Sequence, residues 1–169
     1  LGDAAAAVAG GAEVMSQGGY HIPAMRWGSR LGHAEMTDMM LGALHDPFGI
    51  GHMGITAENV AKDYNVTRED MDTFALTSQK RAAHAVDKGY FKDQITPIKI
   101  KKRREEVIFD KDEHVRAETT ADGLASMRPA FDIEGQVTAG NSSGINDGAA
   151  ALILGNADKV KKSARDPLA

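Results

Sequence analysis

The most informative part of the chain lies near its C-terminal end and reads Val137-Thr-Ala-Gly-Asn-Ser-Ser-Gly-Ile-Asn-Asp-Gly-Ala-Ala-Ala-Leu-Ile-Leu154. Its glycines predict a turn with φ > 0 positions, or a turn whose backbone approaches a ligand closely. The apolar run Ala149–Leu154 that follows is typical of a strand buried on both faces, as in the sheets of α/β proteins. We therefore predict an α/β fold in which a glycine-rich turn leads into a buried strand.

The other patterns of the sequence also alternate between strands and helices. Asp3–Ala9 reads as a buried strand that ends in a turn at Gly10-Gly11, although its alanines also suit a helix. The best-defined helix spans 68–88, with a capping box formed by Thr67 and Asp70 and a stop at Gly89. The remaining predictions are helices at 35–44 and 57–62, a hairpin over 95–109 with a basic tip at 101–104, and a short helix or tail over 158–169.

Composition excludes several classes of protein. The chain has 169 residues, enough to bury roughly 70% of its unfolded surface, and no cysteine, which excludes disulfides, thiolate metal sites and a cysteine nucleophile on this chain. A net charge of −4 argues against a general nucleic-acid binder. We see no transmembrane run and no secretory signal, so we expect no membrane partner and a cytoplasmic location, with mitochondria or peroxisomes left open. The start at Leu1, within what reads as the middle of an element, suggests a fragment.

Tyr20–Gly32 is rich in Gly, Pro, Trp, Arg and Met and has no regular period, so we predict an extended loop. Exposed aromatic and methionine side chains in a loop often mark a protein contact. Packing of the loop on its own domain explains the composition equally well.

Gly140-Asn-Ser142-Ser-Gly144 matches the G-x-S-x-G nucleophile elbow of α/β-hydrolases. That elbow needs a helix after the serine and a histidine downstream of it. Here all six histidines precede Ser142 and a strand follows the turn, so we favour a plain glycine-rich turn over a serine hydrolase.

Three weaker signals have structural explanations beside their functional ones. His45, Asp46 and His52 could meet at a metal, but their spacing is not a metal-binding motif and we predict no metal site. The run Lys99–Arg104 is most simply a solvated hairpin tip. Arg116 stands apart from that run and is suited either to pairing with an acid or to holding a phosphate.

Four segments, taken in order, resemble the thiolase family (acetyl-CoA C-acetyltransferases and 3-ketoacyl-CoA thiolases) over residues 3–160. They are Val8–Ser16 (VAGGAEVMS), Gly51–Ala61 (GHMGITAENVA), Arg128–Asp132 (RPAFD) and Val137–Ala150 (VTAGNSSGINDGAA). The resemblance implies part of a doubly wound α/β half with an inserted α+β loop domain. Residues 1–18 would end the N-terminal half before the insertion, 19–144 would form the loop domain for coenzyme A and assembly, and 145–169 would return to the sheet.

The resemblance also implies a binding site for acyl-CoA, with coenzyme A as substrate and no separate cofactor. His52 and Met53 would lie beside the pantetheine arm and the acyl pocket, and Arg116 would face the ADP phosphates. Ser143 would bind the pantetheine amide. Small and apolar side chains would line the rest of the site: Leu44, Leu124, Ala130, Phe131, Ala139, Gly144 and Ile145. These residue types suit an anionic head on an amphipathic arm.

Two positions depart from the family pattern. Ser142 stands where alanine is common, and Gly123 stands where a serine often reaches the nucleotide, which puts one hydrogen bond on the adenine side in doubt.

The resemblance to thiolases implies a Claisen exchange that uses two cysteines, a histidine and an asparagine. By resemblance the cysteines and the catalytic histidine would lie before Leu1 and after Ala169, so we expect an enzyme by family but no activity from this chain alone. The resemblance places a tetramer contact at Tyr20–Gly32, which implies a homo-oligomer. The alternative is a non-catalytic module that binds coenzyme A or mediates assembly.

Overall fold

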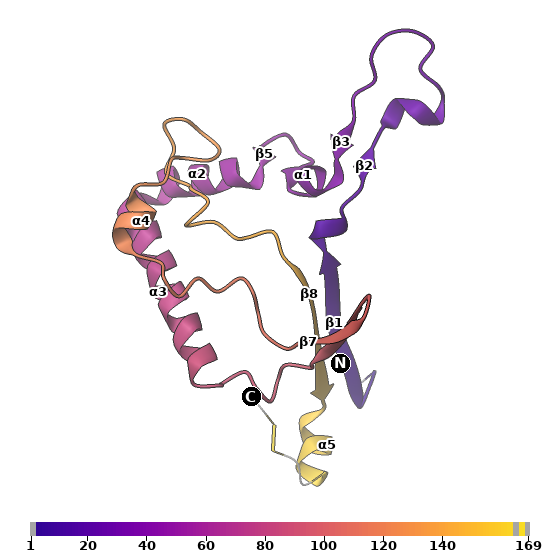
Figure 1. Cartoon of the computed structure of the whole chain (residues 1–169), viewed down its shortest axis with the longest axis vertical. Helices are drawn as coiled ribbons and strands as arrows, with labels where there is room; N and C mark the ends of the chain where they lie inside the picture. The colour runs from indigo at the N-terminus through magenta and orange to yellow at the C-terminus, as the bar shows by residue number, and fades with distance from the viewer. Residues whose placement is uncertain (1–2, 164–165, 168–169) are drawn as a thin grey trace. The chain divides into compact units, whose positions relative to one another are not determined.

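A computed structural model describes residues 3–163 and 166–167 (Figure 1). Its backbone contacts divide the chain into two compact units. The first unit comprises residues 1–40 and 145–169, and the second comprises residues 41–144.

The first unit is built on a pair of long antiparallel strands, β1 (Ala6–Val14) and β8 (Asp147–Gly155), which run side by side along their whole length (Figure 1). Gly10 permits the close approach of the two backbones, because a Cβ there would lie 2.6 Å from the carbonyl oxygen of Ala150. The backbone N–H and hydroxyl of Ser16 donate to the carboxylate of Asp147 and fasten the end of the ladder.

The rest of the first unit is short elements and loops. An extended arm carries two 3₁₀ turns, Met15–Gln17 and Pro23–Arg26, and the two-residue strands β2 (Tyr20–His21) and β3 (Thr37–Asp38). Trp27 and Leu31 in this arm are 90% and 98% exposed. The helix α5 (Ala157–Lys162) follows β8, and α1 (Met39–Ala43) leads into the second unit.

Two helices dominate the second unit. Helix α2 (Met53–Tyr64) ends at Asn65, whose left-handed conformation closes the helix, and α3 (Arg68–Asp87) starts three residues later. The Thr67 hydroxyl accepts a hydrogen bond from the N–H of Asp70, and the Asp70 carboxylate accepts bonds from the N–H and hydroxyl of Thr67. This reciprocal capping box confirms the predicted start of the helix. The stop is confirmed as well, since Gly89 takes a positive φ of 70°.

Around the two helices lie short strands, one short helix and long loops. The strands β4 (His45–Asp46) and β5 (Gly51–His52) pair ahead of α2, and α4 (Ala121–Ala125) contacts α3. The hairpin of β6 (Ile98–Lys102) and β7 (Glu105–Phe109) confirms the predicted hairpin, with Arg103 and Arg104 at its tip. Residues 126–144 form an irregular loop, and their contacts build most of the candidate site.

Several sequence-based predictions need correction. The first strand does not turn at Gly10-Gly11 but continues to Val14, because β8 pairs with it over nine residues. The strand predicted to be buried on both faces is exposed, with Leu152 and Ile153 at 63% and 84%, because β1 and β8 pair only with each other among the described residues. The helix predicted at 57–62 is longer, and the one predicted at 35–44 is only α1. The short helix predicted near the C-terminus is α5, while residues 164–165 and 168–169 of that segment lie outside the described residues.

Candidate functional site

The site centres on His52 and Phe131, which lie far apart in the sequence and meet in the fold. Their rings stack with centroids 4.8 Å apart and an interplanar angle of 22°. Gly54 makes this contact possible, since a Cβ at that position would overlap the Phe131 ring. Nδ1 of His52 accepts a hydrogen bond from the Gly54 N–H at 3.0 Å, which caps α2. In that state Nδ1 is unprotonated, so neutral His52 carries its proton on Nε2.

Leu44 and Met53 border this pair. The Met53 N–H donates to the carbonyl oxygen of Leu44 at 2.8 Å, and Met53 is 52% exposed at the start of α2. His45 lies opposite His52 in the β4–β5 pair, and their rings meet edge to face at 5.4 Å. The rings of His45, His52 and Phe131 therefore lie together where α2 begins.

The loop that carries Phe131 is joined to the glycine-rich turn. Pro129 and Thr138 form an isolated antiparallel bridge, and the Ala130 N–H donates to the carbonyl oxygen of Val137 at 2.9 Å. Thr138 is fully buried, and its hydroxyl oxygen accepts bonds from the N–H groups of Gly140 and Asn141. The bridge therefore couples the position of Phe131 to that of the turn.

Gly140 is needed for close packing and not for a special backbone angle. No described residue between Gly135 and Gly148 has a positive φ, so the prediction of φ > 0 positions in this turn is wrong. A Cβ at Gly140 would lie 2.6 Å from Cδ2 of Leu124 and from Sδ of Met127. Leu124 is only 2% exposed and belongs to the core of the unit, under the turn.

The remaining predicted site residues divide by exposure and by unit. Ala130, Ala139 and Ser143 are exposed and Gly144 is half-buried, whereas Ile145 lies in the first unit. The neighbouring Ser142 has a buried hydroxyl with no hydrogen-bond partner in the structure, and the turn continues into β8 without an intervening helix. This geometry lacks the helix of a nucleophile elbow.

Arg116 is exposed and is anchored through its backbone. Its N–H donates to Oε1 of Gln79 on α3 at 2.9 Å, and its carbonyl oxygen accepts from the Thr119 hydroxyl at 2.8 Å. The segment is therefore fixed while the guanidinium remains exposed to solvent.

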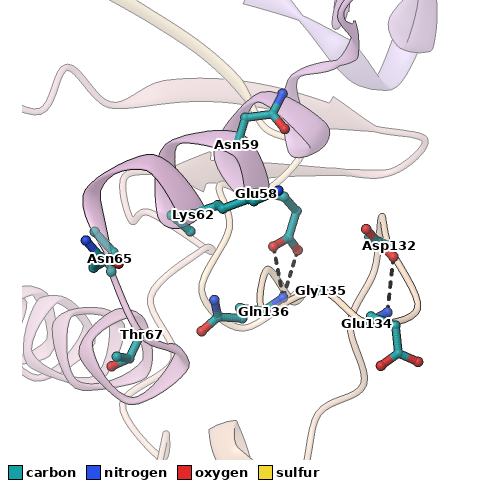
Figure 2. Close-up of a pocket in the computed structure, with 11 residues that line it drawn as sticks. Glu58, Asn59, Lys62, Asn65, Thr67, Asp132, Glu134, Gly135 and Gln136 are labelled. Carbon is teal, nitrogen blue, oxygen red and sulfur yellow. Dashed lines mark hydrogen bonds between the residues drawn. The ribbon is translucent and has the colours of Figure 1, made fainter.

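A cleft of about 570 Å³ lies on another part of the second unit (Figure 2). Most of its lining is polar or charged and comes from α2, the α2–α3 junction and the loop after Phe131: Glu58, Asn59, Ala61, Lys62, Asn65, Val66, Thr67, Asp132, Glu134, Gly135 and Gln136. None of the predicted site residues lines it. The Glu58 carboxylate at its edge is already occupied by backbone N–H groups of the loop, so the cleft offers few free groups to a ligand.

The described residues give no sign of a metal centre or a membrane span. No three His, Asp or Glu side chains in that part of the chain gather closely enough to hold a metal ion. In the same part, no helix combines the length and the apolar character needed to cross a membrane.

Sequence reasoning missed the polar side chains that support the site. Glu58 accepts bonds from the N–H groups of Gln136 and Val137, at 2.7–3.0 Å. Asp72, 8% exposed, pairs with Arg68 at 2.7 Å and accepts a bond from the amide of Asn141 at 3.0 Å. The spacing of Arg68 and Asp72, four residues apart on one helix, was the available signal, but such pairs usually lie on a solvated surface.

Comparisons with known proteins agree with this fold. Residues 1–158 match the family described as thiolase, N-terminal domain. The chain is 52% identical over 170 aligned residues to the β-ketothiolase BktB of Cupriavidus necator, covering 43% of that protein, and 51% identical to an acetyl-CoA acetyltransferase of Pseudomonas aeruginosa, covering 41%. It thus spans about two-fifths of the length of these relatives.

Solved structures show the same likeness. The acetyl-CoA acetyltransferase of Bacillus anthracis superimposes with a TM-score of 0.90 at 48% identity, covering 99% of this chain and 43% of that one. Human mitochondrial 3-ketoacyl-CoA thiolase gives a TM-score of 0.85 at 39% identity, covering 96% and 42%. The architecture is thus the α/β thiolase fold, and the chain belongs to the thiolase family.

Proposed function

We propose that this chain is the part of an acetyl-CoA C-acetyltransferase that holds coenzyme A and acyl-CoA during Claisen condensation and thiolysis. The observation that carries the proposal is its identity of about half to β-ketothiolase and acetyl-CoA acetyltransferases along nearly its whole length. The domain assignment belongs to the same proposal, with 19–144 as the loop domain between 1–18 and 145–169 of the N-terminal half.

The second unit offers surfaces that suit the two ends of coenzyme A. Met53, Phe131 and the exposed Ala139 are small or apolar groups for the pantetheine arm, and the exposed Ser143 supplies a polar anchor for its amide. Arg116 presents an exposed guanidinium on an anchored backbone, which suits the phosphates. His52, held as the Nε2–H tautomer by its cap bond, is a donor beside the acyl end of the arm.

Calorimetric titration of the 169-residue chain with coenzyme A and with pantetheine tests the binding proposal. Loss of one charge-assisted contact weakens binding by roughly tenfold or more, so Arg116→Ala should reduce the affinity for coenzyme A by about that factor and leave pantetheine binding unchanged. Arg104→Ala, at the exposed hairpin tip, is the matched control. If Arg104→Ala weakened binding and Arg116→Ala did not, the phosphates would lie at the hairpin instead. Absence of coenzyme A binding would refute the proposal.

The reaction itself needs groups that this chain does not supply. The chain has no cysteine, whereas the family's exchange uses a thiolate nucleophile and a second thiolate as base. We propose that these cysteines and the catalytic histidine belong to polypeptide outside the 169 residues, and that the isolated chain does not cleave acetoacetyl-CoA. Thiolysis by the purified chain, followed as loss of acetoacetyl-CoA absorbance, would overturn this.

A non-catalytic module that binds coenzyme A or mediates assembly is the alternative, favoured by the same lack of cysteine. The full reading frame separates the two, because cysteine-containing segments on either side are expected only for the enzyme.

The exposed arm at Tyr20–Gly32 is the proposed contact in a homo-tetramer, and a cytoplasmic location is part of the same proposal. An assembly that stays intact after Trp27→Ala and Leu31→Ala would argue against that contact.

A further inference from the structure

Asp72 is a buried carboxylate on α3 that touches none of the predicted ligand-binding residues with its side chain. One of its oxygens accepts from Nε of Arg68 at 2.7 Å, and the other accepts from Nδ2 of Asn141 at 3.0 Å. Asn141 lies in the glycine-rich turn, two residues before Ser143. A single carboxylate therefore links the first turns of α3 to the turn on which the proposed amide anchor sits.

Arg68 extends this link to α4. Its Nη2 donates to the carbonyl oxygens of Leu124 and Met127, at 2.6 and 3.1 Å, at the C-terminal end of α4. The Leu124 oxygen also accepts the N–H of Met127, at 3.1 Å. Asp72 fixes the guanidinium in this position through Nε. Two segments that carry predicted site residues, α4 with Leu124 and the glycine-rich turn with Ser143, are thus both held by the Arg68–Asp72 pair.

Asn141 cannot rearrange to compensate for a change at position 72. Its Nδ2 donates to Asp72 and to the carbonyl oxygen of Gln136, and its Oδ1 accepts from the N–H of Thr138 at 2.7 Å. Rotation of the amide by 180° would place its nitrogen against the Thr138 N–H. Both ends of the side chain are therefore committed to one orientation.

We propose that Asp72, acting through Arg68 and Asn141, is the positioning residue that holds the glycine-rich turn in the conformation that binds the pantetheine arm. The inference rests on the proposed binding of coenzyme A. Thr138 passes the constraint on, because it bonds Asn141 on one side and bridges to Pro129, two residues from Phe131, on the other. Arg116 is outside this network and is anchored on α3 by Gln79.

The test uses Asp72→Asn in the 169-residue chain, which keeps the volume of the side chain. An amide that still accepts from Arg68 turns its NH₂ toward the NH₂ of Asn141, so the bond to the turn is lost. If the binding-competent turn is then populated at about one tenth, the affinity for pantetheine and for coenzyme A falls about tenfold. The affinity for adenosine 3′,5′-bisphosphate, which would report on Arg116, stays unchanged. Asp63→Asn, at an exposed position of α2, is the matched control.

Two additional measurements keep the outcomes distinct. Amide hydrogen exchange of Thr138–Gly144 should speed up in Asp72→Asn, while exchange of α2 should not. Asn141→Ala, which keeps the ion pair, should reproduce the loss of pantetheine binding.

If Asp72→Asn binds pantetheine as tightly as the unsubstituted chain does, the inference is overturned and the proposed function still stands. An equal loss of affinity for pantetheine and for adenosine 3′,5′-bisphosphate in Asp72→Asn and Asn141→Ala also overturns it, because it shows a purely structural role. Faster exchange throughout the unit would show the same. If the unsubstituted chain binds no coenzyme A, the proposed function fails and this inference fails with it.

Discussion

Substitution of Gly54 by alanine should destabilise the second unit, although alanine is the better helix former. Gly54 is a buried residue in the first turn of α2, and an added Cβ would overlap the Phe131 ring. Replacing an interior helical glycine by alanine normally stabilises by about 0.5–1 kcal/mol. Overpacking costs about 1–3 kcal/mol, and a ring displaced from His52 also forfeits an aromatic contact of about 0.5–1.5 kcal/mol. Since Phe131 is 36% exposed and can swing outward, we expect a net loss of about 1–2 kcal/mol.

The sign of this effect should reverse when the ring is absent. In a Phe131→Ala background the added methyl group no longer meets the ring, so Gly54→Ala should stabilise by about 0.5–1 kcal/mol. The double-mutant cycle then has a coupling energy of about 2 kcal/mol, as expected for residues in direct contact. Urea unfolding is best followed by far-UV circular dichroism, because the longest helices are α2 and α3, whereas the single tryptophan, Trp27, lies in the first unit. Equal effects of Gly54→Ala in the two backgrounds would refute the packing argument.

Three further predictions concern charged side chains. Glu58→Gln places an NH₂ against the N–H groups of the loop and should cost about 1–2 kcal/mol in urea unfolding, whereas the exposed Glu118→Gln should change little. Donation from the Thr67 hydroxyl, and then from its N–H, holds the pKa of Asp70 below its usual 3.8, so the capping box stabilises fully above that pH and its contribution disappears as the pH falls through the lowered value. Asp70→Asn should remove this part of the acid dependence of α3, measured by circular dichroism, and an unchanged acid profile would contradict the assignment. The Ser16 hydroxyl and N–H likewise lower the pKa of Asp147, so Ser16→Ala should raise that pKa toward 3.8 in an NMR titration, while Ser163→Ala should not move it.

Elements with strong local signals were predictable from the sequence. The Thr67–Asp70 box and Gly89 set the limits of α3 through contacts between near neighbours in the chain, and the alternation around Arg103 and Arg104 was enough to predict the hairpin. The predicted end of strand β1 was wrong, because pairing with a strand more than 130 residues away overrides the turn propensity of two glycines. The limits of α2 were missed at the start because its cap is a histidine, a residue that rarely caps helices.

The candidate site could be predicted only in part from the sequence, because the polar contacts that hold it join residues far apart in the chain. A sequence shows that Glu58 and Asp72 lie on helices, but not that their carboxylates reach backbone or amide groups 69–79 residues further along the chain. Periodicity reports which face of a helix is apolar and assigns such carboxylates to the solvated side. The stacking of His52 on Phe131 was missed for the same reason, since only the resemblance, and no local pattern, linked the two positions.

Different kinds of interaction stabilise the first unit and the second unit internally. This difference decides in which unit substitutions can test the proposed function. In the first unit the β1–β8 ladder supplies backbone hydrogen bonds, but Val8 and Ile153 remain 75% and 84% exposed, so burial of apolar surface contributes little there. In the second unit, buried polar groups at Asp72 and Thr138 are satisfied by partners within residues 41–144. Because every residue of the His52–Phe131 pair and of the Asp72 network belongs to that unit, its response to substitution should not depend on the state of the first.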